Sequence, residues 1–406
     1  MNKMNIKSLF ISYNGALEPL LQSQGISYLK GLSKKGIKPF LLTFEKPEQK
    51  EIYTRKNIGK LQKELESHGI RWYFLRYHKW PSLPATLFDM LIGVIVGLYL
   101  CVSKRIDIIH ARGTVSAAIG YAISRVTRKK FIFDVRGLMA DEYVDGGIWK
   151  RDSFSYRLVF YFEKIFLKSA DELIVLTKKI KKVLINKNKN IDIIPCCVDV
   201  LGFNKSSKLT EGLRKKYNLS GKFVFLYVGS IGTWYLLDEM LDLFRIAKGI
   251  ISNVHFLVLT HGDLQIVNDL CKKRGISGDD ITIDKVEFKD ISDHIKLADV
   301  GIFFIKPVFS KSASSPTKFA EYLACGLPVI INSNIGDTEE VVISDRVGVV
   351  IKDFNNAEYV KGVENLLRLI EEGEALKKRC LDVAERDFSL ERGVEQYYGV
   401  YKRLIL

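Results

Sequence analysis

Cysteine and proline are scarce in this 406-residue chain, which contains six cysteines and nine prolines. No two cysteines form a C-x-x-C pair, so the sequence carries neither a zinc knuckle nor a thioredoxin-type redox motif. Six cysteines in this length are too few for a disulfide scaffold, and reduced cytoplasmic thiols are the simplest interpretation. With 47% hydrophobic and 27% charged residues, the chain is globular, neither disordered nor collagenous.

Long hydrophobic runs are also missing. The longest, Met90 to Val102, has 13 residues, whereas a bilayer requires about 20. The short apolar run near the start of the chain stops at Asn14 and Gly15 without a small-residue cleavage pattern, which predicts a first strand and not a signal peptide. We therefore expect a protein without a transmembrane segment.

Several motifs of known chemistry do not occur. The sequence has no G-x-G-x-x-G after its first strand and no G-x-x-x-x-G-K-[ST], so it lacks a dinucleotide fingerprint and a P-loop. It has no H-E-x-x-H, no two aspartates separated by one residue, and no G-x-S-x-G. Neither a metal-centred nor a serine-nucleophile mechanism has support, and we expect no metal and no cofactor.

Positive charge is concentrated in one half of the chain. The net charge is +15, and residues 1–200 hold 34 Lys and Arg against 18 Asp and Glu, leaving 28 against 29 for the remainder. A basic domain favours a polyanionic partner, either nucleic acid or the anionic inner face of a membrane. A generally basic cytosolic enzyme is the alternative interpretation.

Segments rich in Val, Ile and Phe recur along the chain with helical stretches between them. This pattern predicts two α/β domains, each a doubly wound parallel sheet with helices on both faces. We expect a first domain over residues 1–197, a linker over 198–220, a second domain over 221–386, and a terminal amphipathic helix over 387–406 that packs back towards the first domain. Ligands of such sheets bind beyond the carboxyl ends of the strands.

In the second half, the strand V-G-I-F-F-I-K leads through a serine-rich loop into a helix that begins near Pro316. Free backbone N–H groups and the helix dipole make this start an anion site. Lys306, Lys311 and Lys318 surround it, and Glu321 is placed to accept hydrogen bonds from ribose hydroxyls. A capped helix with a salt-bridged glutamate is the alternative.

A second loop of this domain, G-S-I-G-T at residues 229–233, follows a strand and precedes a helix. Its two glycines permit close approach of the backbone to a phosphate. Ser230 and Thr233 can donate their hydroxyls. One such loop is a weak signal, but two at strand ends of one domain support a phosphate-containing ligand.

In the first half, polar residues follow three predicted strands: Asn14 and Gly15, then His110 with Arg112, then Asp134 with Arg136. They should converge at the mouth of the sheet. A core histidine and an inward ion pair are the alternatives. The acidic continuation at Asp141 and Glu142 fits a segment that orders around a polar substrate.

The run S-P-T-K-F-A-E-Y-L-A-C-G-L-P-V-I, residues 315–330, resembles the donor-site helix of the retaining, nucleotide-sugar-dependent glycosyltransferases of family 4. Segments 17–36, 133–149 and 229–241 look like a branch of bacterial exopolysaccharide and cell-envelope transferases, and segment 388–404 is similar to the closing helix of the family. The resemblance covers most of the chain. It implies the GT-B fold, in which two Rossmann-like domains face each other, the first binding acceptor and the second donor.

The resemblance also implies roles for individual residues. The donor-binding residues would be Gly229, Ser230, Gly232, Thr233, Lys306, Lys311, Ser314, Ser315, Pro316, Thr317, Lys318 and Glu321. The acceptor-binding residues would be Asn14, Gly15, Gln22, Gln24, Arg112, Asp141 and Glu142. The residues nearest the chemistry would be His110, Asp134, Arg136 and Lys318.

Three departures from the family pattern stand out. Ala313 occupies the position of the first glutamate in the usual Glu, seven residues, Glu signature. The glycine-rich loop lacks the usual Arg and Lys, so we expect Lys306, Lys311 or Lys318 to supply the charge for the diphosphate. Asp134 and Arg136 stand where many members have a histidine-containing motif.

By resemblance, the protein transfers a sugar from a nucleotide diphosphate sugar to a glycan acceptor, expected to be lipid-linked, with retention of configuration and without metal. The expected setting is bacterial surface polysaccharide synthesis by a peripheral enzyme on the cytoplasmic face of the membrane. A nucleotide-sugar epimerase on the same fold is one alternative. A basic nucleic-acid-binding protein is a weaker one, because no RRM, KH or zinc signature is present.

Overall fold

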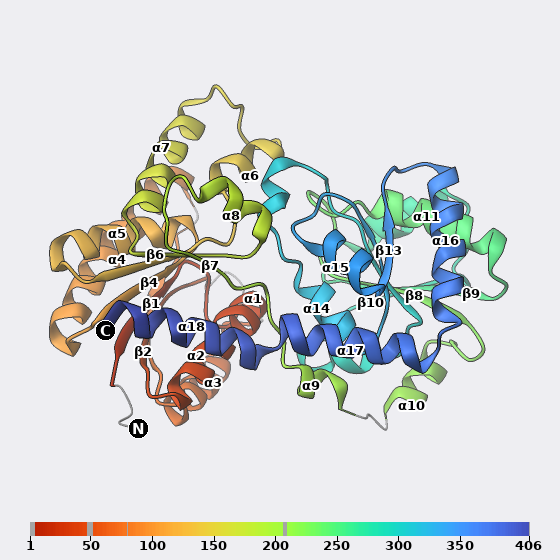
Figure 1. Ribbon diagram of the computed structural model, residues 1–406, viewed down its shortest axis with the longest axis horizontal. Coiled ribbons are helices and arrows are strands. Elements are labelled where there is room, and N and C mark those ends of the chain that lie inside the picture. The colour runs from red at the N-terminus through yellow and green to blue at the C-terminus, as the bar shows by residue number, and fades with distance from the viewer. Residues whose placement is uncertain (1–4, 47–51, 79, 206–208, 406) are drawn as a thin grey trace. The chain divides into compact units, whose positions relative to one another are not determined.

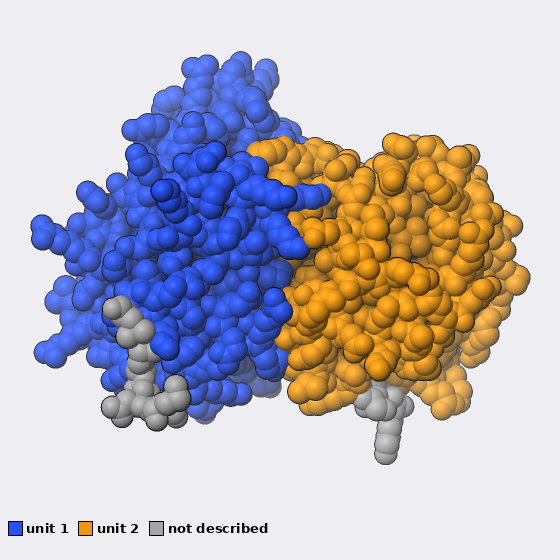
Figure 2. All heavy atoms as spheres, in the orientation of Figure 1, with its two compact units in different colours: residues 1–195, 390–406 blue, residues 196–389 orange. Residues whose placement is uncertain are grey.

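The computed structural model describes residues 5–46, 52–78, 80–205 and 209–405. The chain divides into two compact units, shown in different colours in Figure 2. The first consists of residues 1–195 together with 390–406, and the second of residues 196–389. The first unit is therefore built from both ends of the chain.

Within the described residues, the first unit contains a seven-stranded parallel sheet with strand order β3-β2-β1-β4-β5-β6-β7. Its strands are β1 (Lys7–Ser12), β2 (Lys38–Glu45), β3 (Arg71–Arg76), β4 (Ile108–Arg112), β5 (Lys130–Asp134), β6 (Glu172–Val175) and β7 (Ile191–Ile193). Its helices are α1 (Pro19–Leu21), the π-helix η1 (Gln22–Ile26), α2 (Ser27–Lys34), α3 (Arg55–Ser67), α4 (Ser82–Lys104), α5 (Thr114–Thr127), α6 (Met139–Asp145), α7 (Phe154–Ser169), α8 (Lys178–Leu184) and α18 (Leu390–Ile405).

The central strands of this sheet are buried on both faces, which explains their nearly continuous apolar sequences. Figure 1 shows α4 and α5 on one face and α2 and α18 on the other. Side chains of β4 alternate between them: Ile109 and Ala111 lie against Gly120 of α5, and His110 faces Tyr401 of α18. The polar His110 thus points towards the C-terminal helix.

The second unit has, within its described residues, a six-stranded parallel sheet with strand order β10-β9-β8-β11-β12-β13. The strands are β8 (Phe223–Val228), β9 (Val254–Leu259), β10 (Ile281–Asp284), β11 (Val300–Phe303), β12 (Val329–Asn332) and β13 (Gly348–Ile351). The helices are α9 (Val200–Asn204), α10 (Leu209–Lys216), α11 (Leu237–Ile250), α12 (Leu264–Lys273), η2 (Phe288–Asp290), α13 (Ile291–Ile295), η3 (Phe309–Ala313), α14 (Thr317–Ala324), α15 (Thr338–Asp345), α16 (Asn356–Ile370) and α17 (Glu374–Phe388). The predicted class, two α/β domains with parallel sheets, is confirmed.

The segment expected as a linker, residues 198–220, is part of the second unit. Its described part forms α9 and α10, and Val200, Tyr217 and Leu219 are buried in the core of that unit; residues 206–208 lie outside the described residues. The apolar residues of this stretch are too widely spaced to resemble a strand, but they are enough to anchor two short helices.

Helix α4 is longer than the apolar run from which we expected no transmembrane segment. It begins before that run and spans 23 residues, because Thr86 and Asp89 are accommodated inside the helix. Among the described residues, Leu83–Lys104 is long and apolar enough to cross a membrane by length and composition alone, and 33% of its apolar window is buried inside the protein.

Candidate functional site

The site in the second unit lies where β8 and β11 end and α14 begins. The loop after β8 pairs with the segment after β11, since the backbone N–H of Lys306 donates to Trp234 O at 2.9 Å and Tyr235 forms a β-bridge with Ile305. The hydroxyl of Tyr322, on α14, accepts from the backbone N–H of Val228 at 2.9 Å. These interactions bring both sequence-predicted donor loops to one edge of the sheet.

Lys318 lies at the centre of this edge, although it is only 7% exposed. Its ammonium nitrogen has no hydrogen-bond partner within the part of the chain that the structure describes. It sits 3.5 Å from the centre of the Tyr235 ring and 4.7 Å from that of Tyr227. Cation–π interactions compensate a buried charge only in part, so this ammonium can still bind an anion.

Gly229 lets the backbone pass directly over Lys318. A Cβ atom at this position would lie 2.7 Å from Lys318 Nζ, and the glycine has a positive φ of 148°. Any larger residue would displace the ammonium or the loop. The glycine predicted to allow close approach to a phosphate therefore also makes room for the cation beneath it.

Glu321 is buried on the same helix one turn after Lys318, and the two groups influence each other. Burial lowers the pKa of Lys318 to about 7, while the Glu321 charge opposes that change. Burial raises the pKa of Glu321 to about 7, opposed in turn by Lys318. Two buried groups on one helix whose pKa values lie near neutral pH are typical of a functional site.

The remaining predicted donor residues surround this pair. Lys311 is buried, with its ammonium 3.8 Å from the centre of the Trp234 ring, and Lys306 is partly exposed just after β11. Ser230, Gly232 and Thr233 are exposed on their loop, and Ser314, Pro316 and Thr317 are partly exposed at the start of α14. Ser315 makes a hydrogen bond within the second unit, since its hydroxyl accepts from the backbone N–H of Cys196 at 3.1 Å.

In the first unit, His110 and Asp134 belong to an interior network, as the alternative of a core histidine and an inward ion pair predicts. Both are at most 1% exposed. His110 Nδ1 lies 2.7 Å from the Tyr401 hydroxyl, and the Tyr397 hydroxyl donates to Asp134 at 3.1 Å. Tyr397 and Tyr401 of α18 therefore cover both side chains within the first unit.

Charge within this network is balanced by arginines. Burial alone would raise the pKa of Asp134, but Arg136, His110 and Arg112 outweigh it and hold that pKa well below its usual range. Burial lowers the pKa of His110, although its interaction with Asp134 opposes that change. Arg112 is only 6% exposed and lies 4.0 Å from Asp134, whereas Arg136 is partly exposed. Arg136 is therefore the member of this group nearest to solvent.

Several predicted acceptor residues are engaged in local interactions. The side-chain amide of Asn14 donates to Glu18 at 3.1 Å, and that of Gln22 donates to Ala16 O at 2.5 Å. Gln24 is buried within η1. The space above Gly15 is filled, because a Cβ atom there would lie 1.9 Å from the Tyr53 hydroxyl.

Asp141 and Glu142 lie in the first turn of α6, as expected for acidic residues at a helix start. Asp141 is buried, and its carboxylate accepts from the Tyr156 hydroxyl at 3.4 Å. Burial raises its pKa despite the Arg151 charge nearby. Glu163, which the sequence did not single out, accepts from the backbone N–H of Met139 at 2.8 Å and has its pKa raised to about 7 by burial.

Sequence reasoning also missed a pair at the end of β3. His78 follows that strand, and its Nδ1 lies 2.6 Å from the carboxylate of Asp89 on α4. Asp89 is 1% exposed and also accepts from the Tyr13 hydroxyl at 2.9 Å. The buried carboxylate fixes the imidazole ring, so the half-exposed His78 is oriented for hydrogen bonding. The polar Asp89 at the start of an apolar run was the only signal.

Among the described residues, no group of three or more His, Cys, Asp or Glu side chains is placed to hold a metal ion.

Comparisons with known proteins match both halves of the chain. The family model for group 1 glycosyl transferases matches residues 210–380, and the model for glycosyltransferase family 4 matches residues 26–200. An uncharacterized glycosyltransferase of Methanocaldococcus jannaschii is 21% identical over 285 residues, which are 68% of this chain and 70% of the relative.

Solved structures share the fold of this chain over nearly its whole length. Anabaena HepE in complex with UDP and glucose has a TM-score of 0.72 at 13% identity, covering 98% of this chain and 100% of its own. Sucrose-phosphate synthase from Thermosynechococcus elongatus has a TM-score of 0.75 at 16% identity, covering 98% and 99%. The two family models together span most of the chain, so both of its halves are similar to glycosyltransferases, and the shared architecture shows that it has the GT-B fold.

Proposed function

We propose that this protein transfers a hexosyl or related sugar from a UDP-sugar to a glycan acceptor, with retention of anomeric configuration and without a metal ion. The single observation that carries the proposal is the ammonium of Lys318, buried at the start of α14 under Gly229 without a hydrogen-bond partner among the described residues. A charge so placed is explained by an anionic ligand at the same edge. UDP is chosen as the nucleotide because HepE, which shares the fold, binds it.

Sugar transfer requires that the negative charge on the departing diphosphate be stabilised. Lys318 and the start of α14, whose cap residue Pro316 makes no side-chain hydrogen bond to the helix, provide a cation and N–H donors that are in place before the reaction. Glu321 would hold the ribose. In a front-face mechanism the leaving phosphate takes the proton of the acceptor hydroxyl, so no separate base is needed.

The acceptor side of the proposal uses the first unit. His78, held by Asp89, would donate or accept a hydrogen bond at an acceptor hydroxyl, and the partly exposed Arg136 and Glu142 would offer further polar contacts. Because residues 1–200 carry a large excess of Lys and Arg, we propose a lipid-linked acceptor at the anionic cytoplasmic face of a bacterial membrane, in surface polysaccharide synthesis.

The test is incubation of purified protein with a panel of UDP-sugars and a lipid extract, followed by mass spectrometry of the products and NMR of the new anomeric centre. A product enlarged by one sugar, with the configuration of the donor retained and with activity in excess chelator, is expected. Turnover of the UDP-sugar to an isomer in the absence of any acceptor would instead identify an epimerase, and an inverted product would exclude retention.

A further inference from the structure

Helix α4 presents an unbroken apolar face to solvent. Seven large apolar side chains, each between 51% and 76% exposed, follow one another along it at helical spacing: Leu83, Leu87, Phe88, Leu91, Ile95, Tyr99 and Val102. A helix of 23 residues is roughly 34 Å long. Scattered apolar residues on a surface need no explanation, but a continuous stripe of this length marks an interaction site. We call these seven residues the outer stripe.

The opposite face of α4 is fixed inside the first unit. Gly93 and Gly97 lie against α5, where a Cβ atom would come within 2.9 Å and 2.3 Å of Ile119 and Ile123 respectively. Asp89 is held by Tyr13 and His78 on this inner side. Because one face is part of the core of the unit, the helix can lie along an apolar medium but cannot cross it without unfolding its surroundings.

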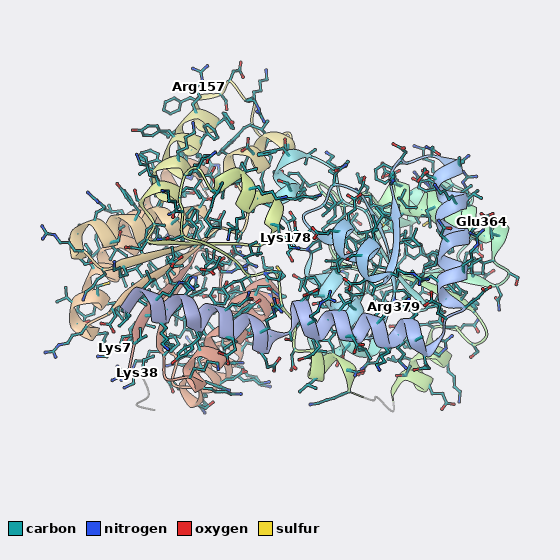
Figure 3. The ribbon with its side chains drawn as sticks, viewed as in Figure 1. Lys7, Lys38, Arg157, Lys178, Glu364 and Arg379 are labelled. Atoms are coloured by element: carbon teal, nitrogen blue, oxygen red, sulfur yellow. The ribbon has the colours of Figure 1, made fainter. Side chains whose placement is uncertain are left out.

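A basic pocket lies at the C-terminal end of the outer stripe. It encloses about 840 Å³, and its charged lining consists of Lys7, Lys38, Arg71, Lys104 and Arg105 against the single carboxylate of Glu66. Lys104 and Arg105 follow Val102 directly in the chain, and Figure 3 shows Lys7 and Lys38 close to each other at the edge of the first unit. We call this the amino-edge pocket, since β1 and β2 begin there.

We propose that the outer stripe and the amino-edge pocket together are the surface on which this protein lies on an anionic bilayer. The stripe enters the boundary between headgroups and acyl chains, and the pocket takes the phosphate of an anionic lipid. An apolar face with a basic pocket at its end matches the two parts of such a lipid. A second copy of the chain fits less well, because it would bring together two first units that carry the same large excess of Lys and Arg.

The proposed membrane surface extends the proposed function. Binding of the outer stripe and the amino-edge pocket to a bilayer does not depend on that function; only the approach of a lipid-linked acceptor does. The Phe88 ring of the outer stripe packs against the His78 ring, with centroids 5.4 Å apart. The apolar face therefore reaches the Asp89-held histidine proposed to contact the acceptor. A lipid-linked acceptor lying in the same bilayer would present its polar head at that end of α4.

The proposal is tested by sedimentation of the full-length protein with vesicles of phosphatidylcholine alone or containing 30% phosphatidylglycerol, without donor or acceptor. Leu91→Glu with Ile95→Glu should weaken binding to the anionic vesicles at least about tenfold, since each buried apolar side chain contributes strongly. Lys38→Gln with Arg105→Gln should weaken it roughly fivefold per charge. The matched controls are Leu201→Glu with Ile343→Glu, exposed on the second unit, and Lys182→Gln with Lys189→Gln.

Binding that weakens but persists when NaCl rises from 0.1 to 0.5 M is expected, because the stripe contributes a part that salt does not screen. Equal effects of stripe and control variants, or absence of binding by the wild type, would overturn the proposal. Two further results would overturn it. One is a wild-type dimer that the Leu91→Glu, Ile95→Glu variant loses, with no vesicle binding by the wild type. The other is binding of soluble glycerol phosphate without any binding of vesicles. UDP affinity of the same variants, measured by calorimetry, is expected to be unchanged and reports separately on the donor site.

Discussion

Replacing Lys318 by Met removes the buried ammonium on which the donor site is built, while keeping an unbranched side chain of similar length. The variant should fold, because the ammonium makes no hydrogen bond within the described residues, and because loss of its charge raises the pKa of the buried Glu321 further and so favours the uncharged carboxyl. A diphosphate bound at this edge would then lose the buried cation that lies beneath Gly229. The substitution therefore separates ligand binding from stability.

The expected fall in affinity depends on the kind of interaction that the ammonium makes with the diphosphate. A hydrogen bond to a charged group contributes about 1.5–3 kcal/mol, which corresponds to a factor of roughly 10 to 150 in affinity. Because Lys318 is only 7% exposed, solvent and salt screen this interaction little, and the upper part of that range is expected.

Calorimetric titration with UDP and with uridine measures the effect. UDP affinity should fall while uridine affinity stays within about twofold, since a charge interaction with phosphate acts only where phosphate is present. Lys306→Met, at a partly exposed position after β11, is the control and should have the smaller effect. Equal small decreases in both variants, or an equal decrease for UDP and uridine, would refute the assignment of Lys318 to the diphosphate.

Four further predictions concern the same two units. Glu321→Gln should lower affinity for UDP and for uridine alike by roughly 10- to 150-fold, because the proposed hydrogen bond is to ribose; calorimetry tests this. UDP affinity of the wild type should fall between pH 7 and 9, by up to about tenfold per unit, because Lys318 loses its proton as pH rises through about 7; a flat profile in the wild type would contradict it. Asp134→Asn should lower the free energy of unfolding by about 3 kcal/mol at pH 7, and the difference should shrink below pH 4, where a carboxyl with a depressed native pKa loses its contribution; urea unfolding at both pH values measures it, with the exposed Asp152→Asn as control. His78→Gln should lower kcat/KM for the acceptor roughly tenfold or more and leave UDP affinity unchanged, and steady-state kinetics at varied acceptor concentration decides.

The fold was readable from the sequence because a buried parallel strand has a strong local signature. Segments such as residues 223–228 and 300–303 are apolar throughout, and each is a strand of a confirmed sheet. The ends of helices that depend on tertiary interactions were harder to predict from the sequence. Helix α4 extends past its apolar run because His78 and Tyr13 satisfy Asp89, and those partners lie elsewhere in the chain.

Prediction of the site residues from the sequence is limited in the same way, because it also depends on contacts between distant parts of the chain. Lys306, Lys311 and Lys318 were equivalent by sequence, and only the positions of Gly229 and Tyr235 single out Lys318. His110 was predicted at the mouth of the sheet, but the hydroxyl next to its ring belongs to a residue 291 positions later. The local sequence of β4 contains no sign of a partner so far away along the chain.

The return of the chain to its first unit through α18 has a consequence for biosynthesis. Tyr397 and Tyr401, which cover Asp134 and His110, are translated only after the whole second unit, residues 196–389. A ribosome that adds 5–20 residues per second needs roughly 10–40 s to make residues 196–389, and throughout that time the polar centre of the nascent first unit has no covering helix. The second unit, continuous in sequence, can complete its fold earlier. The domain that is first in the sequence is thus the last to close, and chains truncated before Tyr397 should be preferred targets of chaperones and proteases.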